Sequence, residues 1–523
     1  MPIPPPSSPS PSDSPTSPPG ASSSALSVGE GATSPAQREI LALGALSLSR
    51  AIHARELSCR EVMDAYLAQI DAANPVVNAI VSHRDHEVLM EEAGECDREL
   101  AAGRSRGWLH GIPQAIKDLS ATRDLPTSMG SPLFKGQVPQ QDGIMVRRMR
   151  EAGAIFVGKT NTPEFGLGSQ TYNRVFGATR NAFDPALCAG GSSGGAAAAL
   201  AMRMLPVADG SDMMGSLRNP AAYHNLFGMR PSFGRVPHGP GPDIFGHQLA
   251  TEGPMARSVG DLARLLATQA GAHPRAPLSL ADDPERLADP FDDADAASGL
   301  RIGWLGDWQG YLAMEEGVLD VCQGALSVFE RLGARVEPVV PEMSPERLWQ
   351  SWLVLRQWAV AGSLSEVWAD DSRRCQLKPE ACWEVEQGMG RTALDVHRAN
   401  VERSAWYACL LGLFERFDAL ALPSAQVFAF DVDTPWPGQI AGRTMDTYHR
   451  WMEVVIAGSL SGCPVINLPA GFNPHGQAMG VQLIAPHRRD RDLLRWAHAF
   501  EQAAPDWLER EPEWRTPKAQ PPR

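Results

Sequence analysis

The sequence predicts an α/β fold in which helices are layered on a central β-sheet, and three observations support this. Helix-like segments and short apolar runs alternate along much of the chain, as they do in layered α/β proteins. Of the 523 residues, 43% are hydrophobic and 21% are charged, which is ordinary for a globular protein and excludes wholesale disorder. A compact chain of this length buries about 75% of its unfolded surface, which is enough to enclose a site.

The first 36 residues are predicted to form a disordered tail. They are rich in Pro, Ser and Gly and carry almost no large apolar side chains to offset the entropy of ordering. The segment lacks the basic start and apolar run of a secretory signal, and no apolar stretch approaches the ~20 residues of a membrane span. We therefore expect a cytoplasmic protein without a membrane partner, an ordered domain over residues 37–511 and a second tail over residues 512–523.

The first long helix is predicted to begin after residue 58. Ser58 followed by Glu61 is typical of a capping box, in which each side chain accepts a hydrogen bond from the other residue's backbone. Apolar residues then recur on one helical face between positions 62 and 70. Asn74 and Pro75 are expected to stop this helix.

A second helix and a short strand are predicted further along. Asp142 is expected to cap a helix that runs through Arg150 and ends at Gly153. Residues 154–157 are apolar and are predicted to form a buried strand.

The C-terminal part continues the alternation. Residues 465–468 and 481–484 are predicted strands, and Asp490 is expected to cap a helix with apolar residues between positions 493 and 500. Residues 275–300 are rich in Asp, Pro and Ala and are predicted to be a linker or a long surface loop.

The region after residue 300 is unusually rich in tryptophan. We expect most of these side chains to pack in the core or between helices, and the alternative for some is an apolar ligand pocket. They are Trp304, Trp308, Trp349, Trp352, Trp358, Trp368, Trp383, Trp406, Trp436 and Trp451.

Charge and cysteine content narrow the classes of partner. The formal net charge is −14, which argues against a nucleic-acid partner because that affinity depends on Lys and Arg neutralising phosphates. The eight cysteines are scattered without a C-x-x-C pair, so we expect free thiols in a reducing compartment rather than a disulfide framework.

Residues 153–160 formally match the phosphate-loop pattern G-x-x-x-x-G-K-T. A phosphate loop needs a strand before its first glycine and flexible residues between the glycines. Here the four intervening residues are non-polar and are themselves predicted to form the strand. We therefore reject nucleotide binding at this segment.

Residues 188–196 (CAGGSSGGA) give the strongest local signal. Two serines lie among four glycines, and glycine permits close approach of the backbone to another group. The Ala-rich residues 196–204 are predicted to be a helix, whose positive dipole end would favour developing negative charge at the loop. A tight turn at a helix start is the structural alternative, but it would not need two hydroxyls in tandem.

The same loop also matches G-x-S-x-G, which permits a nucleophile elbow with Ser192 as the attacking group. An elbow needs an apolar strand directly before it, whereas residues 181–187 are predicted to be a turn. The necessary histidine would have to be His224 or His449. An α/β-hydrolase-type esterase is therefore the less favoured alternative.

Residues 111–118 (GIPQAIKD) and 210–220 (GSDMMGSLRNP) are two further candidate loops. The chain has only five lysines, and Arg carries nearly all of its positive charge. Lys117 lies among apolar residues, where a desolvated lysine can act as a base and an arginine cannot. A lysine reaching solvent from a strand end is the structural alternative.

Taken in order, three motifs resemble the amidase signature family of Ser-Ser-Lys hydrolases: GIPQAIKD, GGSSGGAAA and GSDMMGSLRNPAA. The resemblance runs from about residue 40 to residue 505, is weakest in the middle third, and includes residues 158–165, 227–235, 252–259 and 480–483. It implies a single amidase domain with a large mixed β-sheet flanked by α-helices on both sides. The Trp-rich residues of about 300–450 would then be a variable insertion region.

The resemblance also implies roles for individual residues. Lys117 resembles the catalytic lysine, Ser192 the bridging serine whose preceding peptide bond is cis in the family, and Ser216 the nucleophile. The corresponding substrate contacts would come from Gly190, Gly191, Ser193 and Gln170.

The expected oxyanion hole consists of the backbone amides of Met213, Met214, Gly215 and Ser216. The family has two glycines before the nucleophile, and here Met214 replaces the first. If that position needs a positive φ, methionine would be strained there. If it does not, Met213 and Met214 would shape the pocket with their adaptable apolar side chains.

These residues predict an amidohydrolase that cleaves a linear, small-molecule carboxamide with an apolar or aryl portion, without a metal or organic cofactor. Lys117 would take the proton of Ser216 through Ser192, because a hydroxyl both donates and accepts. The alternatives are the glutaminase subunit of a tRNA-dependent amidotransferase and a non-catalytic scaffold. The sequence is compatible with a homodimer but does not determine the oligomeric state.

Overall fold

The structure is a computed structural model that describes residues 33–239, 241, 243–246, 248–291, 295–504 and 506–513. Its centre is an eight-stranded sheet that pairs parallel at one end and antiparallel elsewhere, so the sheet is mixed. In spatial order its strands are β10 (Arg335–Pro338), β9 (Arg301–Trp304), β11 (Ala419–Pro423), β15 (Ala478–Ile484), β14 (Val465–Phe472), β7 (Phe227–Arg230), β8 (Thr251–Ala256) and β6 (Val207–Asp212).

A second sheet of three strands lies beside β6. Its order is β1 (Ile80–Val81), β3 (Ile155–Thr160) and β2 (Pro113–Lys117), with β2 parallel to β3 and forming the edge strand that contacts β6. Two short hairpins complete the strands: β4 (Tyr172–Asn173) with β5 (Gly177–Ala178), and β12 (Gln439–Ile440) with β13 (Arg443–Thr444). The edges of the two larger sheets therefore meet at β2 and β6.

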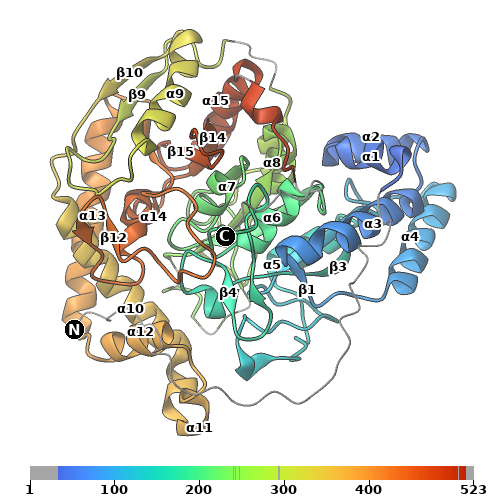
Figure 1. Ribbon diagram of the computed structural model, residues 1–523, viewed down its shortest axis with the longest axis horizontal. Coiled ribbons are helices and arrows are strands. Elements are labelled where there is room, and N and C mark those ends of the chain that lie inside the picture. The colour runs from blue at the N-terminus through green and yellow to red at the C-terminus, as the bar shows by residue number, and fades with distance from the viewer. Residues whose placement is uncertain are drawn as a thin grey trace, which may run out of the picture.

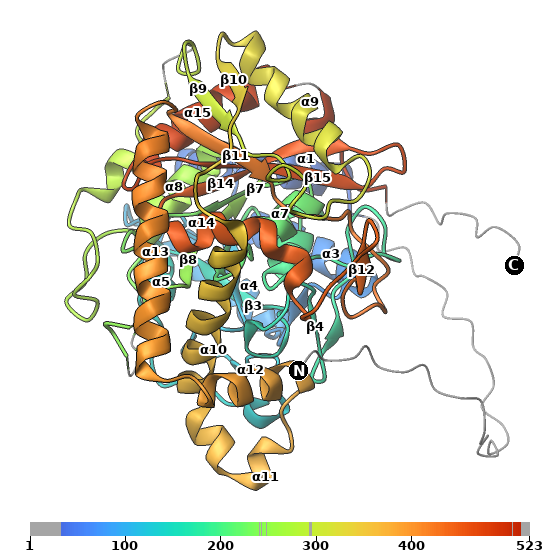
Figure 2. The same ribbon diagram turned by 90° about the vertical axis from the view of Figure 1, so that its left-hand side faces the viewer.

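Helices cover both faces of the large sheet, as Figures 1 and 2 show. The helices α8, α9 and α15 pack on the sheet, α7 packs on β14 and β15, and α14 lies next to the outer helices α10 and α13. The helix bounds are α1 Pro35–Ala42, α2 Ala45–Ala54, α3 Cys59–Val77, α4 His86–Ala101, α5 Ile144–Glu151, α6 Gly194–Ala201, α7 Asn219–Tyr223, α8 Val259–Gln269, α9 Val318–Arg331, α10 Pro345–Ala369, α11 Asp371–Arg374, α12 Pro379–Met389, α13 Ala393–Phe414, α14 Ile456–Ser461 and α15 Asp490–Ala503. The predicted α/β class with a mixed central sheet is confirmed.

The chain ends fall largely outside the described residues. The predicted tails cover residues 1–36 and 512–523, and the structure describes residues 33–36 and 512–513 of them. Helix α1 begins at Pro35, inside the expected tail, because Ser34 and Gln37 form a capping box. In the described part of the chain, no helix combines the length and apolar character that crossing a membrane requires.

The predicted start of α3 is confirmed, but its predicted end is wrong. The Ser58 hydroxyl accepts a bond from the Glu61 amide (3.1 Å), and Glu61 accepts one from the Ser58 amide (2.8 Å). Pro75 lies inside the last turn, where its missing N–H removes only one helical bond. Asn74 accepts the two amides that follow the helix (2.9 and 2.8 Å), and Asn78, at φ 50°, ends it.

Two predicted helix caps are also wrong, for a common reason. Asp142 accepts a bond from Arg150 (2.7 Å) instead of capping α5, which begins after a glycine without a side-chain cap. Asp490 is the first residue of α15 and accepts bonds from the Ser232 amide and hydroxyl (2.8 and 2.6 Å). A side chain of α5 itself thus takes the Asp142 carboxylate, and a residue distant in sequence takes that of Asp490, in place of the expected caps.

The strand predicted at residues 154–157 is longer in the structure. Gly158, Lys159 and Thr160 are the last residues of β3 and lie in its ladders with β1 and β2. Their backbone groups therefore belong to a sheet, which agrees with the rejection of a phosphate loop.

Other predictions from local composition are confirmed. The expected strands at residues 465–468 and 481–484 lie within β14 and β15. The described residues between 275 and 300 contain neither a strand nor an α-helix, only the short 3₁₀ helix Pro284–Ala288. All eight cysteines are free, and five of them are buried.

The Trp-rich region is mostly helical. Trp349, Trp352 and Trp406 are fully buried on α10 and α13, whereas Trp358 is 40% exposed. Core packing is thus the main role of these side chains, as predicted. Long helices in this region stand on one side of the sheet, as Figure 2 shows for α10 and α13.

Candidate active site

Lys117 is the last residue of β2, and its side chain is fully buried. Its Nζ donates hydrogen bonds to Ser192 Oγ (2.8 Å) and to Ser193 Oγ (2.8 Å). The hydroxyl and the carbonyl of Ser211 lie 3.1 and 3.3 Å from the same nitrogen, which has at most three N–H groups to share among these four acceptors. The lysine therefore points away from bulk solvent and into the double-serine turn, which excludes the alternative of a lysine reaching solvent from a strand end.

The surroundings of Lys117 favour its neutral form. Burial lowers its pKa to about 7, although the carboxylates of Asp209, Asp212 and Glu252 act in the opposite direction. An amine that titrates near neutral pH is able both to accept and to return a proton under ordinary conditions.

The double-serine turn is held closely by its neighbours. The Gly191–Ser192 peptide bond is cis, as the resemblance implies for this position. A Cβ on Gly191 would lie 3.0 Å from the backbone of Gln170, a tight contact that favours glycine there. The turn leads directly into α6, whose first residue is Gly194. No strand immediately precedes Ser192 among the described residues, which removes the context that a nucleophile elbow requires.

The loop after β6 carries Ser216 and is tied to a buried carboxylate. Asp212 accepts the amide of Gly215 (3.0 Å) and the amide of Leu217 (3.1 Å). Arg218, also fully buried, donates to the same carboxylate twice at 3.0 Å. Burial opposes ionisation of Asp212, but the guanidinium groups of Arg218 and Arg230 hold its pKa well below the usual value. The charged pair fixes the shape of the loop.

These contacts reduce the number of backbone amides that are free to form the expected oxyanion hole. The Gly215 amide is bonded to Asp212 in this structure, so it is not available to a bound oxyanion. Within the described residues, the amides of Met213, Met214 and Ser216 have no acceptor in the protein. Three of the four expected amides are thus available.

The methionine in place of a family glycine is tolerated without backbone strain. Gly215 has φ 79°, and a Cβ there would lie 2.9 Å from Val455, so this position needs glycine. Met214 does not have a positive φ, and its side chain is buried. The alternative in which Met214 occupies space near the site is the one that fits.

Ser216 is 5% exposed, and its hydroxyl has no hydrogen-bond partner in the protein among the described residues. Gln170 donates from Nε2 to the carbonyl of Val432 (2.7 Å), while its Oε1 is buried without a partner in the described part of the chain. The Gln170 side-chain oxygen is therefore free to accept a bond next to the double-serine turn.

Two residues that sequence reasoning left open have structural roles. His224 bonds the carbonyl of Pro220 (2.9 Å) and the amide of Ala182 (3.3 Å), so both ring nitrogens are engaged. Arg218 donates hydrogen bonds to the Asp212 carboxylate and to the carbonyl of Val455 (2.9 Å). Neither side chain contacts Lys117, Ser192 or Ser216 among the described residues.

A buried polar and aromatic cluster adjoins the nucleophile loop. Arg356 on α10 lies 3.4 Å from the sulfur of Met213 and donates to Glu384 (2.6 Å) and to the Tyr448 hydroxyl (2.7 Å). His449 stacks on the Tyr448 ring, with centroids 4.5 Å apart. Neither His449 ring nitrogen has a hydrogen-bond partner among the described residues. Sequence reasoning missed this cluster because its members are far apart in the chain.

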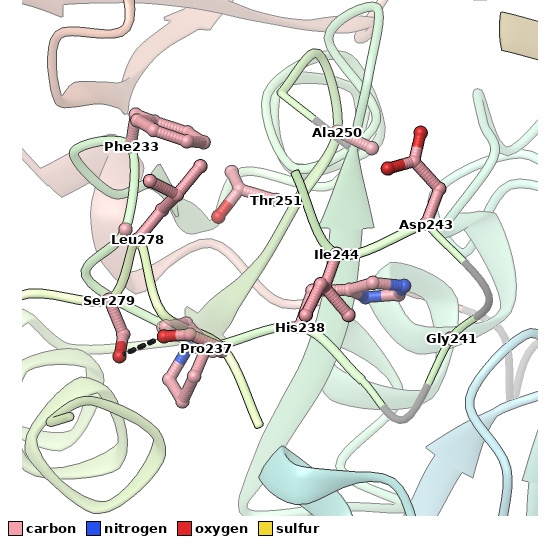
Figure 3. Close-up of a pocket in the computed structure, with 13 residues that line it drawn as sticks. Phe233, Pro237, His238, Gly241, Asp243, Ile244, Ala250, Thr251, Leu278 and Ser279 are labelled. Atoms are coloured by element: carbon pink, nitrogen blue, oxygen red, sulfur yellow. Dashed lines mark hydrogen bonds between the residues drawn. The ribbon is translucent and has the colours of Figure 1, made fainter. Parts of the chain in front are cut away.

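A separate pocket lies at the start of β8. Figure 3 shows it between Phe233, Ile244, Thr251 and Leu278. Thr251 begins β8, opposite Asp212 in the ladder with β6. The lining contains none of the three expected catalytic side chains.

Comparison with known proteins identifies the family. The Amidase family model matches residues 61–494. An acylamidase of Rhodococcus erythropolis is 33% identical over 480 residues, covering 90% of this chain and 97% of the relative. A glutamyl-tRNA(Gln) amidotransferase subunit of Thermus thermophilus is 36% identical over 465 residues, covering 86% and 94%.

Solved structures agree with these relatives. A bacterial aryl acylamidase of the amidase signature family superposes with a TM-score of 0.82 at 28% identity, covering 89% of this chain and 98% of the other. The peptide amidase of Stenotrophomonas maltophilia has a TM-score of 0.72 at 26% identity, covering 88% and 96%. The chain therefore belongs to the amidase signature family and is an amidase, a hydrolase that acts on amide carbon–nitrogen bonds.

Proposed function

We propose that this amidase cleaves a linear carboxamide through a serine acyl-enzyme, with Ser216 as nucleophile, Ser192 as proton relay and Lys117 as base. The observation that carries the proposal is the fully buried Lys117 amine, 2.8 Å from Ser192 Oγ. A serine hydroxyl is a weak nucleophile until a base takes its proton, and a desolvated amine near neutrality is such a base.

The proposed reaction has two halves. In the first, Ser216 attacks the amide carbonyl while its proton passes through Ser192 to neutral Lys117. The amides of Met213, Met214 and Ser216 would hold the oxyanion, and each such donor contributes about 3–4 kcal/mol in related chemistry. Protonated Lys117 then returns the proton through Ser192 to the leaving amine. In the second half, water attacks the acyl-enzyme by the same relay and releases the acid.

The substrate is proposed to be a small-molecule amide with an apolar or aryl portion. The support lies at the nucleophile loop, where buried Met214 and half-buried Met213 provide adaptable apolar surface. Arg356 and Tyr448 continue this surface into a cluster of aromatic rings. A solved aryl acylamidase is among the structural neighbours.

A second candidate function is glutamine hydrolysis as the glutaminase subunit of a tRNA-dependent amidotransferase. The observation in its favour is the 36% identity to a glutamyl-tRNA(Gln) amidotransferase subunit over 465 residues. Release of ammonia from glutamine by this chain, dependent on added partner proteins, would favour this function over the first.

The proposed nucleophile is tested by covalent labelling. A fluorophosphonate probe followed by peptide mass spectrometry is expected to modify Ser216 in the native enzyme. The Ser216→Ala variant should take up no label, whereas the Ser193→Ala variant, whose native hydroxyl also contacts Lys117, should still be labelled at Ser216. Label on Ser192 in the native enzyme would contradict the assignment. A parallel panel of aliphatic amides, anilides and glutamine separates the substrate classes.

A further inference from the structure

We propose that Asp209 is a positioning residue for Lys117: its carboxylate accepts the Lys117 backbone amide, holds the end of β2 from which the lysine projects, and acts electrostatically on the buried amine. This inference rests on the proposed role of Lys117 as base. Asp209 takes no part in the proposed proton transfers, and the inference gives a reason for this buried acid.

The first support is a hydrogen bond between two sheets. The backbone N–H of Lys117 donates to both carboxylate oxygens of Asp209, at 3.3 and 3.2 Å. Strand β2 is the edge strand of its sheet. The amide of Asp118, the next residue, donates to the carbonyl of Thr160 on β3, so the Lys117 amide points away from β3. The outward Lys117 amide would otherwise be a buried, unpaired donor. Asp209 therefore fixes the strand end relative to β6.

The second support is the burial of Asp209. The residue is fully buried, and its only hydrogen-bond donor among the described residues is the shared Lys117 amide. No ion pair of Asp209 lies within 4 Å in the described part of the chain. A buried carboxylate with so few donors is expensive to ionise, so a merely structural role would be served better by a neutral side chain.

The third support is the arrangement of charge around Lys117. The carboxylates whose charges raise the pKa of Lys117 come from β6 (Asp209 and Asp212) and from β8 (Glu252). Asp212 is neutralised by two buried guanidinium groups. Glu252 is half-buried and accepts a bond from the Ser120 hydroxyl at 3.0 Å. Asp209 is the remaining carboxylate, and the cations that act on it are Lys159 on β3 and Lys117 itself.

The charge of Asp209 has a defined consequence. Burial alone favours a neutral amine, which makes a ready base but a poor acid for the leaving group. A nearby negative charge raises the pKa of Lys117 back toward neutrality. Burial also raises the pKa of Asp209 to about 7, while the hydrogen bond from the Lys117 amide and the charges of Lys159 and Lys117 act in the opposite direction.

The test compares Asp209→Asn with the native enzyme. Asparagine keeps an oxygen to accept the Lys117 amide but removes the charge. We expect the acidic limb of kcat/KM for 4-nitroacetanilide to move to lower pH by about half a unit or more, because the amine loses its stabilising anion. The pH dependence of fluorophosphonate labelling should move by the same amount, which gives a readout independent of the substrate.

The matched control is Asp261→Asn. Asp261 is also buried and also accepts backbone amides, those of Ala45 and Leu46 at 3.0 and 2.9 Å, but it has no contact with Lys117. Its loss should lower thermal stability and leave both pH profiles in place. If Asp209→Asn does not fold, Asp209→Ser, which leaves room for water, is measured in the same way.

Two failures are distinguishable. A folded Asp209 variant whose kcat/KM profile keeps the native acidic limb would overturn this inference. The proposed base would still be supported if that limb is present in the native enzyme and absent in Lys117→Ala. A native enzyme whose labelling does not depend on Lys117 would instead overturn the proposed function.

Discussion

At the scale of single residues, the proposed mechanism depends on where one amine is buried. Lys117 and Lys159 lie on neighbouring strands, and both are fully buried. Lys159 donates to a carbonyl at 2.7 Å and to the hydroxyls of Thr122 and Thr127, away from the double-serine turn. Lys117 alone meets that turn among the described lysines. Two similar side chains on adjacent strands therefore differ in their contacts, and of these two only Lys117 contacts the serines.

The proposed role of Lys117 as base, with its pKa of about 7, predicts the pH dependence of the reaction. The base must be neutral to act, so kcat/KM should fall as the pH drops below 7 and level off above it. In Lys117→Ala we expect a loss of about 10³-fold above neutral pH and no limb near pH 7, because general bases contribute about 10²–10⁴-fold. Measuring kcat/KM against pH for both enzymes checks this. Retention of the limb in the variant would place the titrating group elsewhere.

Met214 should control which amides fit. Because it is buried and has no positive φ, Met214→Gly removes side-chain volume without relieving strain. We expect bulky amides to gain relative to acetamides, together with a loss of stability of about 2–5 kcal/mol for a large-to-small change. The ratio of kcat/KM for the two amide classes is the measurement. Identical ratios in both enzymes would show that Met214 does not line the substrate pocket.

At the scale of elements, the nucleophile loop depends on one buried ion pair. Asp212 ends β6 and Arg218 precedes α7, so the pair spans the loop that carries Ser216. The amides of Gly215 and Leu217 bind the same carboxylate. A loop with no regular structure thus becomes rigid enough to present three amides in fixed directions.

The Asp212→Asn variant should be less stable than the native enzyme by about 3–5 kcal/mol at neutral pH, since it leaves two buried guanidinium groups without their anion. The folded-state pKa of Asp212 lies below its unfolded value. Its contribution is therefore complete above the unfolded pKa of about 3.9 and is lost as the pH falls further.

Urea unfolding at several pH values measures this difference. The stability gap between the two proteins should be constant from neutral pH down to about pH 5 and should narrow below that. A gap that grows in acid would mean that Asp212 is not ionised in the native enzyme.

At the scale of the whole molecule, the Trp-rich region reaches back to the catalytic loop. Arg356 of α10 joins Glu384 of α12 and Tyr448, and its guanidinium lies against Met213. The segment that resembles the family least in sequence thus contacts the loop that carries Ser216. If the proposed site is correct, variation there would change the substrate preference without moving Lys117, Ser192 or Ser216.

Arg356→Met should lower kcat/KM for anilides more than for aliphatic amides, because the support of Met213 is lost. It should also destabilise the protein, since Glu384 is then a buried charge without its cation. The double variant Arg356→Met/Glu384→Gln separates the effects: its stability should recover in part, while the anilide preference should stay reduced. Kinetics with both substrate classes and thermal melts provide the readouts. Recovery of the preference together with stability would show that Arg356 acts on folding alone.

Local sequence predicted some elements well and others poorly. The prediction of a capping box at Ser58 and Glu61 is confirmed, because the two residues are only three positions apart and the interaction is local. The caps assigned to Asp142 and Asp490 fail because other partners compete for the carboxylates. The roles of Asp209 and Arg356 were invisible to local patterns, since each acts through residues more than 90 positions away.

The sequence by itself determined the family, the α/β class and the residues that the family motifs carry, because glycine-rich loops and a rare lysine are recognisable without coordinates. Only the tertiary structure decided which amides remain free after Asp212 takes that of Gly215, and which buried acid faces Lys117. The physical reason is that hydrogen-bond capacity and desolvation depend on every neighbour that folding brings to a site, and a linear pattern contains only the neighbours along the chain.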